Sequence, residues 1–97
     1  MANWQYENNH GRITRIYPHT DKLFFRFGGK ASEVKTDMNP KDGYYFIPIT
    51  HPNYKALADL LYLAAEHDWN IFARPKEALT ADGYAEVTYL VQDFVRP

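Results

Sequence analysis

One amphipathic segment, His51–His67, has the sequence HPNYKALADLLYLAAEH and is the strongest signal of regular structure in the chain. Pro52 suits a first helical turn, and Thr50 or His51 can serve as the N-cap. Apolar side chains recur at helical spacing on one broad face, namely Tyr54, Leu57, Ala58, Leu60, Leu61, Ala64 and Ala65. We therefore predict one helix from about Pro52 to His67 that packs this face on a hydrophobic core.

Three strand candidates precede this helix. The apolar residues of Arg12–Tyr17 do not fall on one alternating side, which indicates a β-bulge or a strong bend. Leu23–Phe27 alternates cleanly, and Tyr44–Ile49 contains Pro48, which favours a sheet edge or a strand end. Between these two strands lies the polar segment Lys30–Gly43, which we expect to form a long, mobile surface loop.

Two strand candidates follow the helix. Trp69–Arg74 alternates with period two, and Tyr84–Phe94 is the longest candidate. The residues of the latter that share a side are Ala85, Val87, Tyr89 and Val91. An order of three strands, one helix and two strands matches a five-stranded OB-fold-like Greek-key barrel. An open antiparallel sheet packed on one helix is the alternative, but the bent first strand and the long last strand favour the barrel.

The length and composition describe a single domain, residues 1–97, because a second core would need roughly 100 further residues. Residues 1–10 are a candidate flexible N-terminal segment. Trp, Tyr and Phe make up 16% of the chain, so these rings should supply much of the stability of so small a core. The core residues that we predict are Ile13, Ile16, Leu23, Phe25, Phe27, Phe46, Leu57, Leu60, Leu61, Ala64, Ile71, Val87, Tyr89 and Val91.

Several segments resemble a group of small bacterial OB-like domains. In that group a Gly-x-Ile-x-x-Ile strand opens the fold, a phrase close to His-Pro-x-Tyr-x-x-Leu precedes an Ala-rich helix, and Gly-Tyr-x-x-Val leads into the closing strand. The matching segments here are Gly11–Ile16, His51–Leu57, Leu61–Ala65 and Gly83–Val87. The resemblance implies the same barrel without a catalytic motif. The topology is also similar to that of the pentameric glycan-binding B subunits of AB-type bacterial toxins, a likeness that transfers no site residues.

The sequence offers little for catalysis or for metal binding. It contains no Cys, which removes disulfides, thiol catalysis and thiolate metal sites. The histidines at positions 10, 19, 51 and 67 include no pair at the short spacing of zinc ligands. Ser32 is the only serine, and no Gly-x-Ser-x-Gly motif surrounds it. We therefore expect no enzyme, no metal site and no cofactor.

Ligand binding is the function class that the sequence favours. OB-folds usually bind oligosaccharides or oligonucleotides across the second and third strands and the adjoining loops. Here that surface is predicted to present Arg15, Phe24, Arg26 and Tyr45, with Phe24 exposed because its neighbours along the strand face the core. We expect an oligosaccharide or a similar ligand. Nucleic acid is disfavoured, because 11 Lys and Arg against 12 Asp and Glu leave no surplus of positive charge.

A protein partner is the alternative. Trp4 and Tyr6 precede the first strand in a polar setting, and both residue types are frequent interface anchors. The protein would then be an inhibitor, an immunity protein or an accessory subunit, or it would form a homo-oligomer. Residues 1–7 lack the features of a secretion signal, and no window approaches the roughly 18 apolar residues of a membrane span. We accordingly expect a soluble cytoplasmic protein that has no membrane partner.

Overall fold

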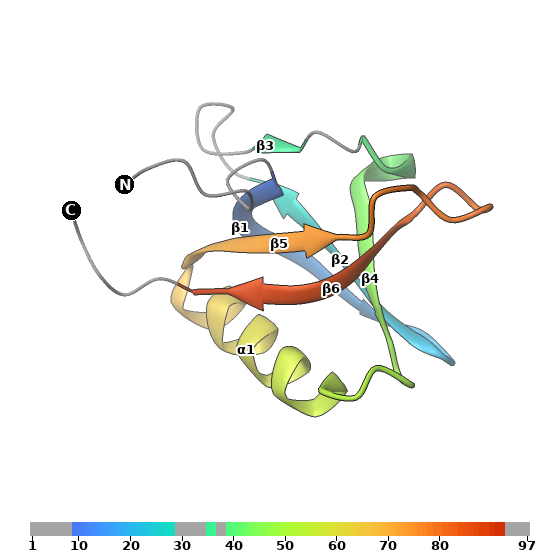
Figure 1. Ribbon diagram of the computed structural model, residues 1–97. Helices are drawn as coiled ribbons and strands as arrows, with labels where there is room; N and C mark the ends of the chain where they lie inside the picture. The colour runs from blue at the N-terminus through green and yellow to red at the C-terminus, as the bar shows by residue number, and fades with distance from the viewer. Residues whose placement is uncertain (1–8, 29–34, 37–38, 93–97) are drawn as a thin grey trace.

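The structure is a computed structural model that describes residues 9–28, 35–36 and 39–92 (Figure 1). Its elements, in chain order, are β1 (Asn9–Pro18), β2 (Lys22–Gly28), β3 (Lys35–Thr36), the 3₁₀ turn η3 (Lys41–Gly43), β4 (Tyr44–Pro48), α1 (Tyr54–His67), β5 (Asn70–Pro75) and β6 (Ala85–Val91). The five longer strands and the helix follow the predicted order, and the predicted mainly β fold with one helix is confirmed for these residues.

Five of the described strands close into a ring. Antiparallel pairs join β1 to β2, β2 to β4, β5 to β6 and β1 to β5. A short parallel pairing of β4 with β6, through Tyr45–Ala85 and Phe46–Glu86, completes the circuit. The helix α1 lies across one end of this ring, below β6 in Figure 1, and contacts β1, β4 and β6. The closed ring rules out the open-sheet alternative.

The hydrophobic core fills the ring and continues under α1. Its buried members are Ile13, Leu23, Phe25, Tyr45, Ile47, Leu57, Leu61, Ala64, Ile71, Ala73, Ala85, Val87 and Leu90. Ile16, Phe27 and Leu60 pack against this cluster at partly buried positions. Three predicted core residues behave differently. Phe46 is buried outside the cluster, Val91 is half-buried, and Tyr89 is 39% exposed.

The exposure of Tyr89 has a local cause, a β-bulge in β6. Pairing with β5 moves from Arg74–Tyr89 to Pro75–Val87, so Thr88 is an extra residue on β6. The alternation of side chains is interrupted there, which places Leu90 in the core and turns Tyr89 outward. The prediction that Val87 and Tyr89 share a side is therefore wrong.

A second bulge, in β1, confirms the interruption predicted from the sequence. Pairing with β2 moves from Ile13–Phe27 to Arg15–Arg26, so Thr14 is the extra residue. Ile13 and Ile16 both pack on the core as a result, although three positions separate them. Arg15 and Tyr17 are exposed on the other side of the strand.

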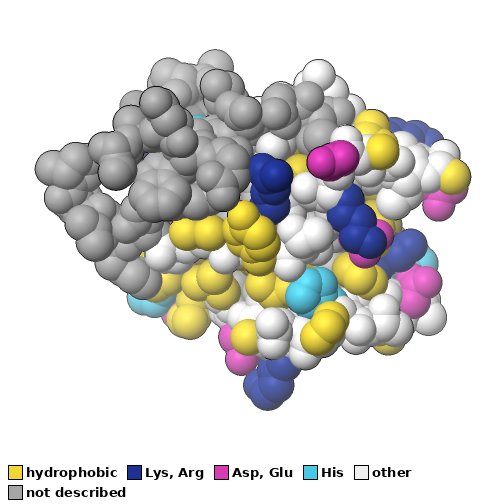
Figure 2. Space-filling model, viewed as in Figure 1, with side chains coloured by type: hydrophobic (Ala, Val, Ile, Leu, Met, Phe, Trp, Pro, Cys, Tyr) yellow, Lys and Arg dark blue, Asp and Glu magenta, His cyan; other side chains and the backbone are white. Residues whose placement is uncertain are grey.

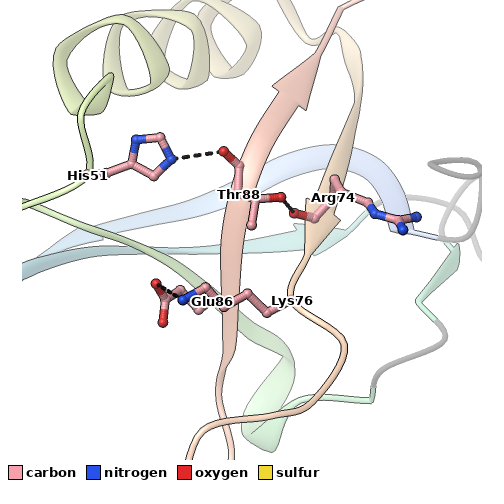
Figure 3. Close-up of polar contacts among 5 residues, drawn as sticks. All are labelled: His51, Arg74, Lys76, Glu86 and Thr88. Atoms are coloured by element: carbon pink, nitrogen blue, oxygen red, sulfur yellow. Dashed lines mark hydrogen bonds and ion pairs between the residues drawn. The ribbon is translucent and has the colours of Figure 1, made fainter.

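The helix begins two residues later than predicted. Asn53 is its N-cap, so the predicted start at Pro52 and the capping by Thr50 or His51 are wrong. The His51 ring instead connects the helix entrance to the bulge in β6, as Figure 3 shows. The Asn53 amide donates to Nδ1 of His51 (3.0 Å), and Nε2–H of His51 donates to the Thr88 carbonyl (2.8 Å). Both ring nitrogens are thus used by a neutral imidazole.

The segments predicted to be irregular are partly ordered into strands. Within Lys30–Gly43, β3 pairs with the start of β1, so this part of the expected loop is a strand. Residues 30–34 and 37–38 lie outside the described residues, so the mobility of this segment stays a prediction. Asn9 and His10 of the expected flexible segment 1–10 belong to β1, and residues 1–8 lie outside the described residues. Trp4 and Tyr6 also lie outside the described residues.

Candidate functional site: an aromatic face with two arginines

Strand β2 separates the core from an outer surface. Leu23 and Phe25 point into the ring, whereas Phe24 and Arg26 lie on the opposite side. Cross-strand pairing places Tyr17 of β1 beside one edge of Phe24 and Phe46 of β4 beside the other. The outer side of β1, β2 and β4 therefore gathers aromatic rings.

We call this surface the aromatic face and define it by five rings, those of Tyr17, Phe24, Tyr44, Phe46 and Tyr84. Phe24 lies at its centre and stacks on Tyr17, with ring centroids 5.7 Å apart and planes inclined by 22°. Edge-on contacts join Phe24 to Tyr44 (5.5 Å) and to Tyr84 (5.1 Å). Such geometries are the favoured ones for aromatic pairs.

The surrounding rings leave Phe24 only 8% exposed, so the prediction that it is an exposed residue is wrong. It does face away from the core, as predicted, but the neighbouring side chains cover it. Tyr17, Phe24, Tyr44 and Tyr84 together line a small pocket that is open to solvent. His19 adds an edge-on contact to Tyr17 at 5.7 Å. The outer surface thus has an apolar floor and a rim of tyrosines.

Tyr45 is not part of this face, and its prediction as a surface ligand-binding residue is wrong. Its side chain has no exposed surface, and its ring stacks on Phe25 in the core at 5.7 Å. The Tyr45 hydroxyl donates to Oδ1 of Asn9 at 2.6 Å. Tyr44 takes the outer position, because it pairs with Arg26 while Tyr45 pairs with Phe25.

Arg15 and Arg26 both contact Tyr44. They are direct cross-strand partners, and Nη1 of Arg15 donates to the Tyr44 hydroxyl at 3.0 Å. The Arg26 guanidinium carbon lies 5.4 Å from the centroid of the Tyr44 ring, within cation–π range. The hydrogen bond from Arg15 lowers the pKa of Tyr44 below its ordinary value of 10.0; burial opposes this shift, and Arg26 adds to it.

The charges around these arginines are unbalanced. Carboxylates pair with other cations, as in Lys22–Asp21 (3.8 Å) and Lys76–Glu86 (3.1 Å), the latter drawn in Figure 3. Among the described residues, no carboxylate lies within ion-pair distance of Arg15 or Arg26. Charges of both signs are interspersed on the side of the molecule seen in Figure 2. The aromatic face is therefore locally cationic.

The Tyr84 ring reaches this face through a tight turn that sequence reasoning missed. The Gly83 amide donates to the Thr80 carbonyl (2.9 Å), and the Tyr84 amide donates to the Thr80 hydroxyl (3.2 Å). The Gly83 carbonyl accepts from the Lys41 amide (2.7 Å), which ties the turn to η3. Gly83 adopts a φ of +92°, which only glycine adopts easily. The Asp82–Gly83 pair was the available turn signal.

Other chemistry finds little support in the residues described. They contain no group of three or more His, Asp and Glu side chains that could hold a metal ion. No described helix combines the length and the apolar character that crossing a membrane requires. Comparison with family models, curated proteins and solved structures finds no match to this chain. The aromatic face, in turn, brings a pocket and two arginines together on one surface.

Proposed function

We propose that the protein is a non-enzymatic, OB-like binding module that takes an oligosaccharide or a similar ligand on the aromatic face. The observation that carries the proposal is the open pocket lined by Tyr17, Phe24, Tyr44 and Tyr84. Ligand sites are typically concave and apolar, with a few polar groups that fix orientation. A sugar ring would lie over this small pocket, with its apolar face on the aromatic rings and its hydroxyl groups toward the rim.

The rim supplies the polar partners that a sugar needs. Tyr44 offers a hydroxyl that accepts from Arg15, and the Arg15 guanidinium retains further N–H donors. Tyr17 is 46% exposed and provides a ring surface at the edge of the pocket. These groups lie on β1 and β4, which both pair with β2 within the closed ring of five strands, and this favours a preorganised site.

A protein partner is the second candidate function, and the same face favours it. Tyr and Arg are enriched among the residues that dominate binding energy at protein interfaces. Under this alternative the protein is an inhibitor, an immunity protein or an accessory subunit. An exposed ring such as Tyr17 would then insert into a pocket of the partner.

A glycan array followed by affinity measurements tests the first proposal. Replacing Tyr17 by Ala should weaken binding about fivefold, because a stacked ring contributes on the order of 1 kcal/mol. Tyr62→Ala is the matched control, because Tyr62 is 47% exposed on α1 and lies outside the aromatic face. Equal losses in the two variants, or no binding to any oligosaccharide, would overturn the proposal. A stable complex with a protein instead would favour the second candidate.

A further inference from the structure

We infer that the ligand of the aromatic face is an acidic oligosaccharide, whose anionic group lies between the guanidinium groups of Arg15 and Arg26. This inference rests on the proposed function and assigns the chemical class of its ligand. The anionic group is a carboxylate or a sulfate on a sugar ring, and both would meet the same pair of cations. Three features of the described residues support it.

The first feature is the position of the two arginines. Arg15 and Arg26 are direct partners across β1 and β2, although like charges placed opposite each other in a sheet repel. The extra residue Thr14 creates this arrangement, because simple alternation from the buried Ile13 would direct Arg15 toward the core. An anion between the two guanidinium groups would be attracted to both, and these attractions would offset the repulsion between them.

The second feature is the donor capacity that remains on both side chains. A guanidinium carries five N–H donors in a planar fork, and one Arg15 nitrogen donates to the Tyr44 hydroxyl. Arg26 approaches the same tyrosine over its ring. A planar fork suits the paired oxygens of a carboxylate, and such charge-assisted hydrogen bonds are the strong ones. Tyr44 therefore holds the two forks near each other without exhausting their donors.

The third feature is the contrast between the local charge of the aromatic face and the net charge of the chain. The chain has a formal net charge of −1, so the cationic aromatic face is a local arrangement in a nearly neutral protein. A polyanion such as single-stranded nucleic acid needs a groove with many cations along its backbone. Two arginines beside a pocket lined by four aromatic residues suit a ligand that has one anionic group and an apolar face. The lowered pKa of Tyr44 reflects the same two cations.

Calorimetric titration with defined oligosaccharides tests the inference. The probes are a glucuronate-containing oligosaccharide, its carboxyl-reduced neutral counterpart, a sulfated oligosaccharide and an oligothymidine. We expect an anionic sugar to bind about 10- to 100-fold more tightly than the neutral one, the range of a charge-assisted hydrogen bond. The preferred anionic sugar then shows whether the group is a carboxylate or a sulfate.

Variants assign this preference to the two arginines. Arg15→Gln and Arg26→Gln should each reduce the preference for the anionic over the neutral sugar about three- to tenfold, so that the two substitutions together account for the whole preference. Arg74→Gln is the matched control, because Arg74 lies on β5 and pairs with Tyr89 of β6, outside the aromatic face. Thermal unfolding of each variant verifies that the fold is retained.

The outcomes separate this inference from the proposed function. Equal binding of anionic and neutral sugars, lost in Tyr17→Ala, would overturn the inference and leave the proposed function standing. Binding of no oligosaccharide would overturn both, and tight binding of the oligothymidine alone would replace both with nucleic-acid recognition. An anionic preference that survives in Arg15→Gln and Arg26→Gln would also overturn the inference, since other cations would then be responsible.

Discussion

Removing the hydroxyl of Tyr45 should destabilise the protein without affecting its aromatic face. The Tyr45 hydroxyl is buried and donates to Oδ1 of Asn9 at 2.6 Å. In Tyr45→Phe this hydrogen bond between two buried side chains is lost, at a net cost of about 0.5–1.5 kcal/mol. The free energy of unfolding of a domain this small is about 5–15 kcal/mol, so the loss would be a substantial fraction. The midpoint of thermal unfolding should fall by about 4–8 °C per kcal/mol.

Tyr44→Phe is the matched variant, because it removes the same group from the adjacent residue on the opposite side of β4. The Tyr44 hydroxyl accepts from Arg15 at the surface, where water can replace it as the acceptor for the guanidinium. The free energy of unfolding should therefore change by no more than about 0.5 kcal/mol. Chemical denaturation followed by circular dichroism measures the free energy of unfolding of both variants. The dependence of that free energy on denaturant concentration should remain that of the wild type.

A double-mutant cycle with Asn9→Ala isolates the buried contact of Tyr45. We expect a coupling energy of about 0.5–3 kcal/mol between positions 9 and 45, because the two side chains are in direct contact. The reasoning fails if Tyr45→Phe unfolds like the wild type, or if Tyr44→Phe is the more destabilised variant. Either result would mean that the two tyrosines do not occupy the faces described.

Three further predictions follow from the same structure. Leu61→Ala should lower the free energy of unfolding by about 2–5 kcal/mol, measured by denaturation, because Leu61 is fully buried on the inner face of α1. Gly83→Ala should cost about 1–3 kcal/mol and weaken ligand binding, since the φ of +92° is strained for alanine and the turn positions Tyr84. The pKa of Tyr44 should lie below its ordinary value of 10.0. The difference between phenolate absorbance titrations of the wild type and of Tyr44→Phe measures it, and Arg15→Gln should raise it. Because the pKa of Tyr44 is lower in the folded than in the unfolded protein, ionisation of Tyr44 stabilises the folded state. This contribution to the free energy of unfolding is complete above pH 10.0 and is lost as pH falls through the lowered pKa.

Local periodicity predicted the apolar face and the end of the helix, and the buried side of β2. The predicted end of the helix at His67 is correct. Asp68 follows as the C-cap in a left-handed conformation, which ends the helix there. Leu23 and Phe25 alternate along β2 without an interruption, so both side chains reach the core as predicted. Even the bulge of β1 leaves a local trace, because Ile13 and Ile16 cannot both reach the core along a regular strand.

Pairing between distant segments decided what periodicity could not. Tyr44 and Tyr45 are chemically identical neighbours, and only the register of β4 against β2 determines which one is buried. The exposure of Tyr89 likewise depends on a bulge formed with β5, and Val87 gives no local sign of it. Tyr84 reaches Phe24, 60 positions away, through a turn tied to another segment.

The candidate site is thus a product of strand register, and this explains why it carries no recognisable sequence motif. Thr14 shifts the alternation of β1 so that Arg15 and Tyr17 emerge opposite Arg26 and Phe24. The same strand without that extra residue would direct one charged side chain toward an apolar core, where an unpaired charge is costly. Burial of Ile13 and exposure of the arginine pair are therefore two consequences of one bulge. A surface built in this way can bind through residues that are far apart in the sequence and unremarkable when considered one at a time.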